Sequence, residues 1–413
     1  MTATARKVDM ASWPYAAELA RLLDVLDRDG EEARVVGGAV RNALIAMPIH
    51  EVDVATTAVP EEVVRRVNAA GFKAVPTGIE HGTVTVVIDK HPFEVTTLRT
   101  DVETYGRHAK VAFGRSWQDD AARRDFTINA LSVTRDGTVY DYAGGLEDLA
   151  VRRVRFIGDP HQRIAEDYLR ILRFFRFHAA YGPGGHPDAE GLAACITGRD
   201  GLDQLSRERV RQEMMKLLVA PHALPTLIVM TDCGLTLRIL GGVIYAASFE
   251  NMVKVEAAIG VTACPVRRLG ALAVAVAEDA VRLWQRLRLT NKEHARLVSM
   301  AEGWRRLSPS VALDGARVLI YRLGPEAFTD HALLGWARSW ESANDPSWLE
   351  LATLPQRFAA PVFPLKAADF IKRGIGKGPA LGEALRAAEA AWAAQGFPDS
   401  ADALDKIADK AAG

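Results

Sequence analysis

The chain has 413 residues, enough for two or more domains, and 49% of them are hydrophobic while 25% are charged. This composition is that of an ordinary globular protein and excludes disordered and fibrous chains. The formal net charge of −1 argues against a general nucleic-acid coat, so any nucleic-acid contact must come from local basic patches.

Cysteine usage and the amino terminus predict a cytoplasmic protein. Cys195, Cys233 and Cys264 are too far apart for zinc-binding pairs and odd in number, which fits a reducing compartment. Residues 1–7 lack the apolar core of a secretory signal, and charges interrupt every long apolar run. We therefore expect neither a membrane span nor export.

A glycine turn lies between a predicted strand and a predicted helix. Residues 35–36 are strand-like, Gly37 and Gly38 favour a tight turn, and residues 39–46 contain good helix formers. Such a turn leaves backbone N–H groups free at the helix start. Together with Arg41, one turn into the helix, they can hold phosphate groups.

Two carboxylates follow this helix. Glu51 and Asp53 alternate with Val52 and Val54, so a strand would place both acids on one face and both valines in the core. Neighbouring carboxylates repel unless a cation lies between them, and Mg²⁺ prefers oxygen ligands. Taken singly, the turn and the acidic pair have ordinary structural explanations. Combined in one strand-turn-helix-strand unit, they predict phosphoryl or nucleotidyl transfer.

The next elements are two β-branched runs, residues 82–88 and 93–98, which predict strands joined as a hairpin through residues 89–92. Glu94 lies inside the second run. It belongs either to a solvated sheet face or to a two-metal site, in which a third carboxylate would complete the ligand set.

A long connection is predicted over residues 99–122, because this stretch is polar and punctuated by glycine, as in Tyr105-Gly-Arg-His108. The run 123–131 follows it, with sequence Arg-Arg-Asp-Phe-Thr-Ile-Asn-Ala-Leu. From the residues alone, Asp125 in this run can serve as the cap of a helix start.

A single helix is predicted from Pro160 to Gly182, with Leu and Phe side chains pointing in several directions. Arginines in such a buried helix require anionic partners. Asp167 and Arg170 are three residues apart and therefore neighbours on one face. Their side chains offer an acceptor beside a fork of donors, unless they belong to a structural ion-pair network.

That edge predicts a choice among bases. Cytosine presents its N4 amino group beside N3 and O2, and adenine presents N6 beside N1, so both can pair with Asp167 and Arg170. Uracil and guanine place a carbonyl oxygen where Asp167 requires a donor. Discrimination by such hydrogen bonds can reach about 10⁴- to 10⁵-fold, because the wrong base leaves buried polar groups unpaired.

Beyond about residue 220 the spacing of Leu and Ala among Arg and Glu predicts helices only. The segment 363–382 combines glycines with basic residues, as an RNA-phosphate contact requires. An equally simple explanation is a helix-turn-helix with a solvated basic edge. The basic residues of the predicted contact are Lys366, Lys372, Arg373 and Lys377.

The order of these motifs resembles the DNA-polymerase-β-like nucleotidyltransferases, in particular the class II tRNA nucleotidyltransferase and poly(A) polymerase family. The resemblance spans about residues 30–215 and includes Glu166-Asp-x-x-Arg170, which is similar to the protein template of the family. It implies template-independent transfer from CTP and ATP to the 3′ end of tRNA, as in bacterial CCA-adding members. Two Mg²⁺ ions are implied as cofactors, tRNA, CTP and ATP as partners, and no DNA.

The resemblance also implies an α+β fold, with a polymerase-β-like nucleotidyltransferase head followed by an all-helical neck, body and tail. The tail is expected to bind tRNA, and the neck to carry the base-recognition helix. The implied parts are an N-terminal helix 1–29, the head 30–150, the neck 151–235, the body 236–350 and the tail 351–413.

Residue roles follow from the same resemblance. Glu51, Asp53 and Glu94 are the implied catalytic metal ligands. The implied nucleotide-binding residues are Gly37, Gly38, Arg41, Arg124, Asp125, Asn129, Asp167, Arg170, Arg173 and Arg176.

Two residues depart from the family pattern, which usually has Asp where Glu51 and Asn42 stand. Glu51 leaves one alternative open, a non-catalytic RNA-binding protein built on a decayed head. Two alternatives with the same chemistry also stay open: a poly(A) polymerase, and a partial enzyme that adds only CC or only A. The sequence makes no prediction of oligomeric state.

Overall fold

The computed structural model describes residues 6–78, 82–105 and 108–413, and the chain divides into two compact units. The first unit is Met1–Leu235 and the second is Thr236–Gly413. The first combines sheets with helices, whereas all the regular elements described in the second are helices. The predicted α+β class with a helical carboxyl-terminal half is confirmed, and the finer division into head, neck, body and tail stays a prediction.

A seven-stranded sheet lies at the centre of the first unit, with strand order β3-β4-β5-β2-β1-β8-β9. Strands β2 and β5 are parallel, and the other neighbours are antiparallel. Strand β2 is hydrogen-bonded to β1 on one side and to β5 on the other, so both neighbours fix its register. The strands are β1 (Ala33–Val36), β2 (Asp53–Thr56), β3 (Lys73–Gly78), β4 (Thr83–Ile88), β5 (His91–Thr97), β8 (Ser132–Val133) and β9 (Val139–Tyr140).

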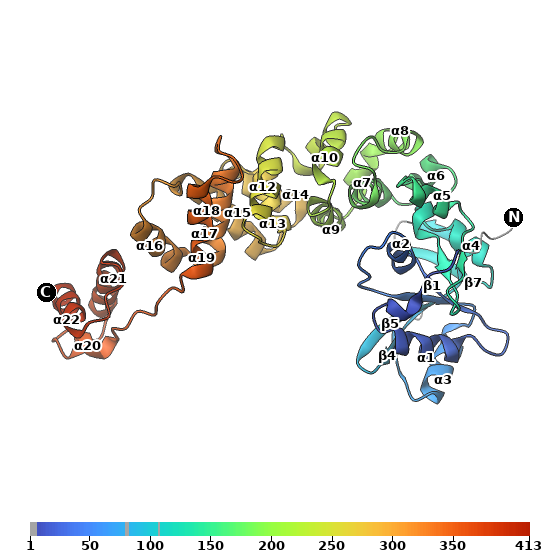
Figure 1. Ribbon diagram of the computed structural model, residues 1–413, viewed down its shortest axis with the longest axis horizontal. Coiled ribbons are helices and arrows are strands. Elements are labelled where there is room, and N and C mark those ends of the chain that lie inside the picture. Colours follow the sequence, from blue (N-terminus) through green and yellow to red (C-terminus); the bar gives the residue numbers. More distant parts are fainter. Residues whose placement is uncertain (1–5, 79–81, 106–107) are drawn as a thin grey trace. The chain divides into compact units, whose positions relative to one another are not determined.

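Helices α1 (Ala16–Leu26) and α3 (Pro60–Ala69) lie beside the strands of this sheet in Figure 1. Helix α1 buries four leucines at helical spacing, as the sequence predicts, and α3 begins at Pro60. The predicted hairpin between β4 and β5 is also confirmed. Its turn residues Asp89 and Lys90 have φ values of 48° and 73°, which suits the twist of a two-residue hairpin.

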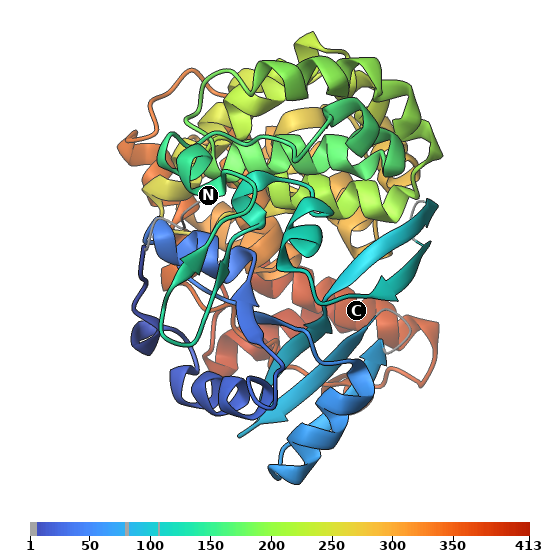
Figure 2. The ribbon, with the colours of Figure 1, turned by 90° about the vertical axis from the view of Figure 1, so that its right-hand side faces the viewer.

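The predicted connection 99–122 is instead a β-hairpin followed by a helix. Strands β6 (Arg99–Tyr105) and β7 (His108–Phe113) pair with each other in a separate two-stranded sheet, and α4 is Trp117–Ala122. The hairpin stands apart from the main sheet in Figure 2. Its polar composition concealed the strands, because pairing within a hairpin satisfies the backbone hydrogen bonds whatever the side chains are. Residues 106–107 of the predicted 105–108 run lie outside the described residues.

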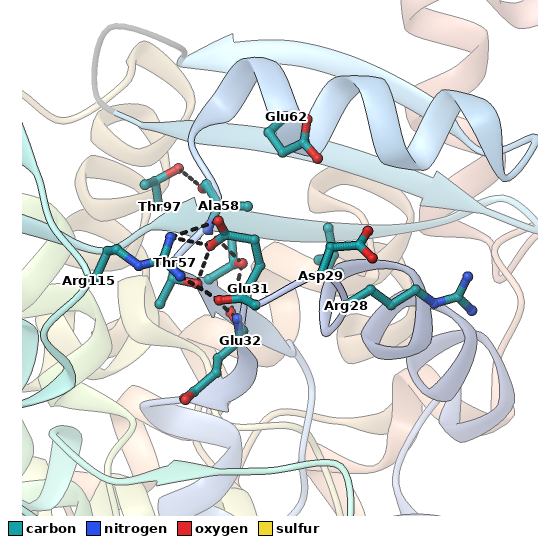
Figure 3. A network of polar contacts seen from close by, with 12 residues as sticks. Arg28, Asp29, Glu31, Glu32, Thr57, Ala58, Glu62, Thr97 and Arg115 are labelled. Carbon is teal, nitrogen blue, oxygen red and sulfur yellow. Dashed lines mark hydrogen bonds and ion pairs between the residues drawn. The ribbon is translucent and has the colours of Figure 1, made fainter.

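A polar network fixes the base of this hairpin (Figure 3). Arg115, just after β7, donates to both carboxylate oxygens of Glu31 at 2.7 and 2.8 Å and to the carbonyl oxygen of Gly30 at 2.5 Å. Thr57 donates to Glu31 at 2.5 Å and accepts from the backbone N–H of Glu32 at 2.8 Å. The network therefore connects the end of β7 to the segment before β1 and to the end of β2.

Replacing Glu31 with glutamine should lower the free energy of unfolding at neutral pH by up to about 1 kcal/mol. Burial by itself raises the pKa of Glu31, but hydrogen bonds from Arg115 and Thr57 and the charge of Arg115 together lower it below the ordinary 4.5. Because the folded-state pKa is the lower one, this stabilisation is present above pH 4.5 and is lost as the pH falls through the folded-state value.

Thermal unfolding of wild type and Glu31→Gln from neutral pH downwards measures this effect. The difference in melting temperature should shrink on acidification, and the exposed Glu61→Gln control should show none. A difference that stays constant across the pH range would contradict the assignment.

A series of helices covers residues 145 to 240. The predicted single helix 160–181 is two helices, interrupted at Asp167 and Tyr168, where Asp167 has extended backbone angles of φ −156° and ψ 106°. The helices are α5 (Gly145–Ala150), α6 (Pro160–Glu166), α7 (Leu169–Tyr181), α8 (Ala189–Thr197), α9 (Arg207–Leu218), α10 (Ala223–Asp232) and α11 (Leu235–Leu240).

A buried charge cluster organises the second unit. Arg267 donates to Glu256 at 2.8 Å and to Asp330 at 2.7 Å, so it connects three helices. None of the helices in the described ranges is both long and apolar enough to cross a membrane. The helices of this unit are α12 (Ala246–Ala258), α13 (Pro265–Ala273), α14 (Ala277–Leu287), α15 (Asn291–Gly303), α16 (Leu313–Leu323), α17 (Pro325–Ala337), α18 (Pro346–Ala352), α19 (Leu354–Arg357), α20 (Ala367–Ile371), α21 (Pro379–Ala394) and α22 (Ala401–Ala412).

Candidate active site

Two cavities of the first unit collect the residues predicted from its motifs. The first cavity, of about 580 Å³, is lined by Gly37, Gly38, Arg41, Glu51, Asp53, Arg124, Asp125, Asn129, Asp167, Arg170, Arg173, Arg176, Phe177 and Tyr181. The second cavity, of about 370 Å³, shares Glu51 and Asp53 with the first and adds Glu94. All the catalytic and nucleotide-binding residues implied by the resemblance line one cavity or the other.

The carboxylates approach each other through strand pairing. Asp53, the first residue of β2, is the parallel partner of Glu94 on β5. Their side chains therefore point from the same face of the sheet. Glu51 lies before β2 rather than within it, which corrects the predicted strand, although Val52 and Val54 are buried as predicted. Position within the sheet thus fixes Asp53 and Glu94, and the preceding loop places Glu51.

Mutual repulsion of these acids is visible in the pKa of Asp53. Burial, then the negative charges of Glu94 and Glu51, raise this pKa above its ordinary value. Within residues 6–78, 82–105 and 108–413, no three His, Cys, Asp or Glu side chains are gathered closely enough to form a metal-binding group. The three carboxylates supply the hard oxygen donors that Mg²⁺ prefers, so their chemistry fits this ion.

Arg41 is a buried cation beside the glycine turn. Its guanidinium donates to Asn129 Oδ1 at 2.5 Å, to the Tyr181 hydroxyl at 2.6 Å and to Asn42 Oδ1 at 2.9 Å. In the described part of the chain, it forms no ion pair with a carboxylate. Burial lowers the pKa of Arg41 to about 10. A buried guanidinium with only neutral partners is a strong site for an anion.

Gly37 is predicted to be essential for this arrangement. It has φ 71°, and a Cβ placed there would lie 3.4 Å from Nη1 of Arg124. Gly37→Ala should cost about 1–2 kcal/mol in backbone strain. Relief of this strain changes the turn whose backbone N–H groups face the cavity, and the added methyl group touches the guanidinium of Arg124, so nucleotide affinity should fall.

Gly71→Ala is the matched control, since Gly71 has φ 79° but open space around a Cβ. Calorimetric titration with CTP separates the two variants. Both should lose stability, and only Gly37→Ala should bind CTP more weakly. Equal affinities would show that the glycine turn is structural.

Most of the other arginines have carboxylate partners. Arg124 pairs with Asp120 at 3.0 Å, and Arg173 pairs with Asp125 at 2.5 Å. Burial by itself raises the pKa of Asp125, but the charge of Arg173 and hydrogen bonds from Asn129 and Arg173 outweigh it and lower this pKa. The cap position of the short helix Thr127–Asn129 is Phe126, and Asp125 is engaged in this buried ion pair, so Asp125 is not the helix cap.

The predicted Asp167–Arg170 pair is not formed directly. Asp167 lies in the break between α6 and α7 and pairs with Arg209 of α9 at 2.6 Å. Arg170 instead pairs with Glu166, one turn back along the chain. The assumption of one continuous helix was wrong, because a residue in the break does not follow helical spacing. Both side chains nevertheless line the same cavity, so the base-reading edge stays a prediction.

Several residues of the site were not found from the sequence. Phe177 and Tyr181 line the cavity, and helical spacing from Arg173 indicates both of them. Spacing also indicates Asp120, four residues before Arg124. Arg209 and Glu213 pair with Asp167 and Arg176 of the site, and no local signal in the sequence identifies these partners.

The tail gives Arg373 a structural role. Its guanidinium pairs with Asp405 at 2.6 Å and with Asp409 at 2.7 Å, and so connects the end of α20 to α22. Both aspartates are largely exposed, and surface ion pairs of this kind are weak. The predicted RNA contact through Lys366, Lys372, Arg373 and Lys377 therefore stays a prediction.

Comparisons with known proteins agree with the site geometry. Residues 33–155 match the poly A polymerase head domain, and residues 187–243 match the probable RNA- and SrmB-binding site of polymerase A. The first match includes the glycine turn and all three carboxylates. The second includes α9.

Relatives cover nearly the whole chain. The mitochondrial CCA tRNA nucleotidyltransferase 1 of Homo sapiens is 34% identical over 94% of this chain and 89% of its own. The CCA-adding enzyme of Limosilactobacillus fermentum is 31% identical, covering 90% and 91%. The crystal structure of the Bacillus stearothermophilus CCA-adding enzyme in complex with CTP superposes with a TM-score of 0.76 at 29% identity, covering 95% and 97%. The chain therefore belongs to the family of CCA-adding tRNA nucleotidyltransferases.

Proposed function

We propose that this protein transfers CMP and then AMP from CTP and ATP to the 3′ end of tRNA without a nucleic-acid template. The 3′ hydroxyl of the RNA loses its proton and forms a bond to the α-phosphorus of the nucleotide. The bond between the α- and β-phosphates breaks, and pyrophosphate leaves. Relatives with near-complete coverage are named for this activity, which supports the proposal.

One observation carries the proposal. A single cavity brings the carboxylates Glu51 and Asp53 together with the buried cation Arg41 and with Asp167 and Arg170. An acidic pair, an anion site and an edge of donors and acceptors are the three requirements of template-free nucleotidyl transfer. Glu94, in the adjoining cavity, completes the carboxylate set.

The chain's own residues provide most of the positioning. Arg41, with the backbone of the glycine turn, would hold the leaving phosphates. Asp167 and Arg170 would select cytosine and adenine by their hydrogen-bonding edges. Glu51, Asp53 and Glu94 would hold Mg²⁺, two ions by resemblance to the family, and such ions neutralise phosphate charge and favour loss of the hydroxyl proton.

The test uses tRNA that ends at the discriminator base, the full-length protein, Mg²⁺ and each nucleoside triphosphate alone or in combination. We expect CMP incorporation from CTP, and AMP incorporation only after two cytidines. Long AMP tracts would indicate a poly(A) polymerase, and products limited to CC or to A would indicate a partial enzyme. If no product forms, the protein would be the non-catalytic RNA-binding protein built on a decayed head.

The remaining predictions concern location and partners. The cytoplasmic location stays a prediction, because the relatives include enzymes named as mitochondrial. We also propose that the tail, residues 351–413, contacts tRNA through its lysines, and that DNA is not a substrate. Competition by DNA in a tRNA-binding assay tests the last point.

A further inference from the structure

Helix α9 carries two residues of opposite charge, one turn apart, that contact residues 167–176, the segment that contains the predicted base-reading edge. Arg209 pairs through Nη2 with Oδ2 of Asp167 at 2.6 Å. Glu213, four residues later, pairs with Arg176 and lies 4.0 Å from Arg173. Residues four apart lie on the same side of a helix, so one face of α9 contacts both charge types of the cavity.

Asp167 depends on these contacts for its orientation. Asp167 lies between α6 and α7, where its backbone carbonyl accepts from the N–H of Arg170 at 3.0 Å while its own backbone angles are extended. Its carboxylate is held from two directions, because Oδ1 accepts from the backbone N–H of Leu169 at 3.1 Å and Oδ2 accepts from Arg209. The side chains of Asp167 and Arg209 are each 18% exposed, so water competes weakly for this bond.

Glu213 engages the two arginines nearest to it on α7, Arg173 and Arg176. Burial by itself lowers the pKa of Arg173, but the charges of Asp125, Glu213 and, least of the three, Asp167 together raise it, so Arg173 lies close enough to Asp167 to be attracted by its carboxylate. Glu213 is buried and draws Arg173 and Arg176 to its own carboxylate. Arg209 is therefore the arginine that pairs with Asp167.

We propose that Arg209 is a positioning residue for base selection, a role that rests on the proposed function and deepens it. An ionised carboxylate only accepts hydrogen bonds, so Asp167 favours a base with an amino group, provided its oxygens face the base. Arg209 fixes that direction. Without it, the carboxylate rotates about its single remaining contact with Leu169, and the penalty against the carbonyl oxygen of uracil falls.

The experiment compares Arg209→Gln and Arg209→Lys with wild type in single-nucleotide incorporation into tRNA that ends at the discriminator base. The quantity measured is kcat/KM for CTP divided by kcat/KM for UTP. We expect this ratio to fall about tenfold or more in Arg209→Gln, and less in Arg209→Lys, which keeps a charged donor. Lys216→Gln, which removes an exposed charge from the same helix, should leave the ratio unchanged.

The ratio stays informative if a variant is less stable, because both rates come from the same folded enzyme and its concentration cancels. An unchanged ratio in Arg209→Gln, alongside a reduced ratio in Asp167→Ala, would overturn the positioning role and leave the proposed function intact. Wild type that incorporates neither nucleotide would overturn both. A fall in the ratio that is equally large in Lys216→Gln would also overturn the assignment.

Discussion

Asp53→Asn should abolish nucleotide incorporation, with kcat for CTP falling by about 10³-fold or more. Asparagine has almost the same shape as aspartate, so β2 and its pairing with β5 should be preserved. The substitution removes one of the two negative charges, those of Glu51 and Asp53, that line both cavities. Single-turnover incorporation into tRNA measures the loss, and tRNA binding should survive. Glu51→Ala should behave in the same way if this longer carboxylate is also a ligand.

The same variant should reveal the electrostatic cost of the site. Because Glu94 and Glu51 act with burial to raise the pKa of Asp53, the ionised acids repel one another in the folded state. Asp53→Asn relieves part of that repulsion, so its melting temperature without divalent cations should equal or exceed that of wild type. Added Mg²⁺ should raise the melting temperature of wild type more than that of Asp53→Asn.

Asp27→Asn is the matched control, because Asp27 is exposed at the end of α1. It should keep both full activity and the response to Mg²⁺. Undiminished turnover in Asp53→Asn would remove Asp53 from the metal site. An identical Mg²⁺ response in Asp53→Asn and wild type would show that the ion binds elsewhere.

Arg41→Ala should raise KM for both CTP and ATP by about 100-fold, the effect of losing a charge-assisted phosphate contact in a buried site. The effect should be the same for both nucleotides, because the triphosphate is their common part. Stability should fall by about 1–3 kcal/mol, since Asn129 and Tyr181 lose their donor. Arg41→Lys should recover only part of the affinity, because an ammonium group lacks the planar fork that reaches several acceptors.

Initial rates at varied nucleotide concentration, with thermal unfolding of each variant, test this prediction. Arg28→Ala, which removes an exposed arginine at the end of α1, should leave KM and stability unchanged. A loss of stability in Arg41→Ala with unchanged KM would assign Arg41 a purely structural role. A loss confined to CTP would place Arg41 beside the base rather than the phosphates.

The contrast between Arg41 and its neighbours explains how the cavity is organised before a nucleotide binds. Arg124 and Arg173 are already held by Asp120 and Asp125. Arg41 has neutral partners only, among the residues described, and so remains the least compensated cation of the cavity. Fixed donors with one uncompensated charge form a preorganised anion site, which needs little rearrangement when a triphosphate arrives.

The sequence by itself determined the features that depend on near neighbours along the chain. The glycine turn follows from the conformational freedom of Gly37, and alternation along β5 leaves Glu94 exposed between the buried Phe93 and Val95. Helical spacing placed Arg170 and Arg173 on one side of α7. In each case, the side chain's direction is set by its own element. The same reasoning failed where an element was misread, at the hairpin 99–113 and at the break that contains Asp167.

Only the tertiary structure decided which charge pairs with which. Asp167 was expected beside Arg170, three residues away, yet its partner is Arg209, 42 residues away. Tyr181 reaches Arg41 across 140 residues. Several arginines and acids of this region carry compatible charges, so composition leaves many pairings open. The packing of α9 against α7 selects among them, because a buried ion pair is stable only where both charges and their hydrogen bonds meet in good geometry.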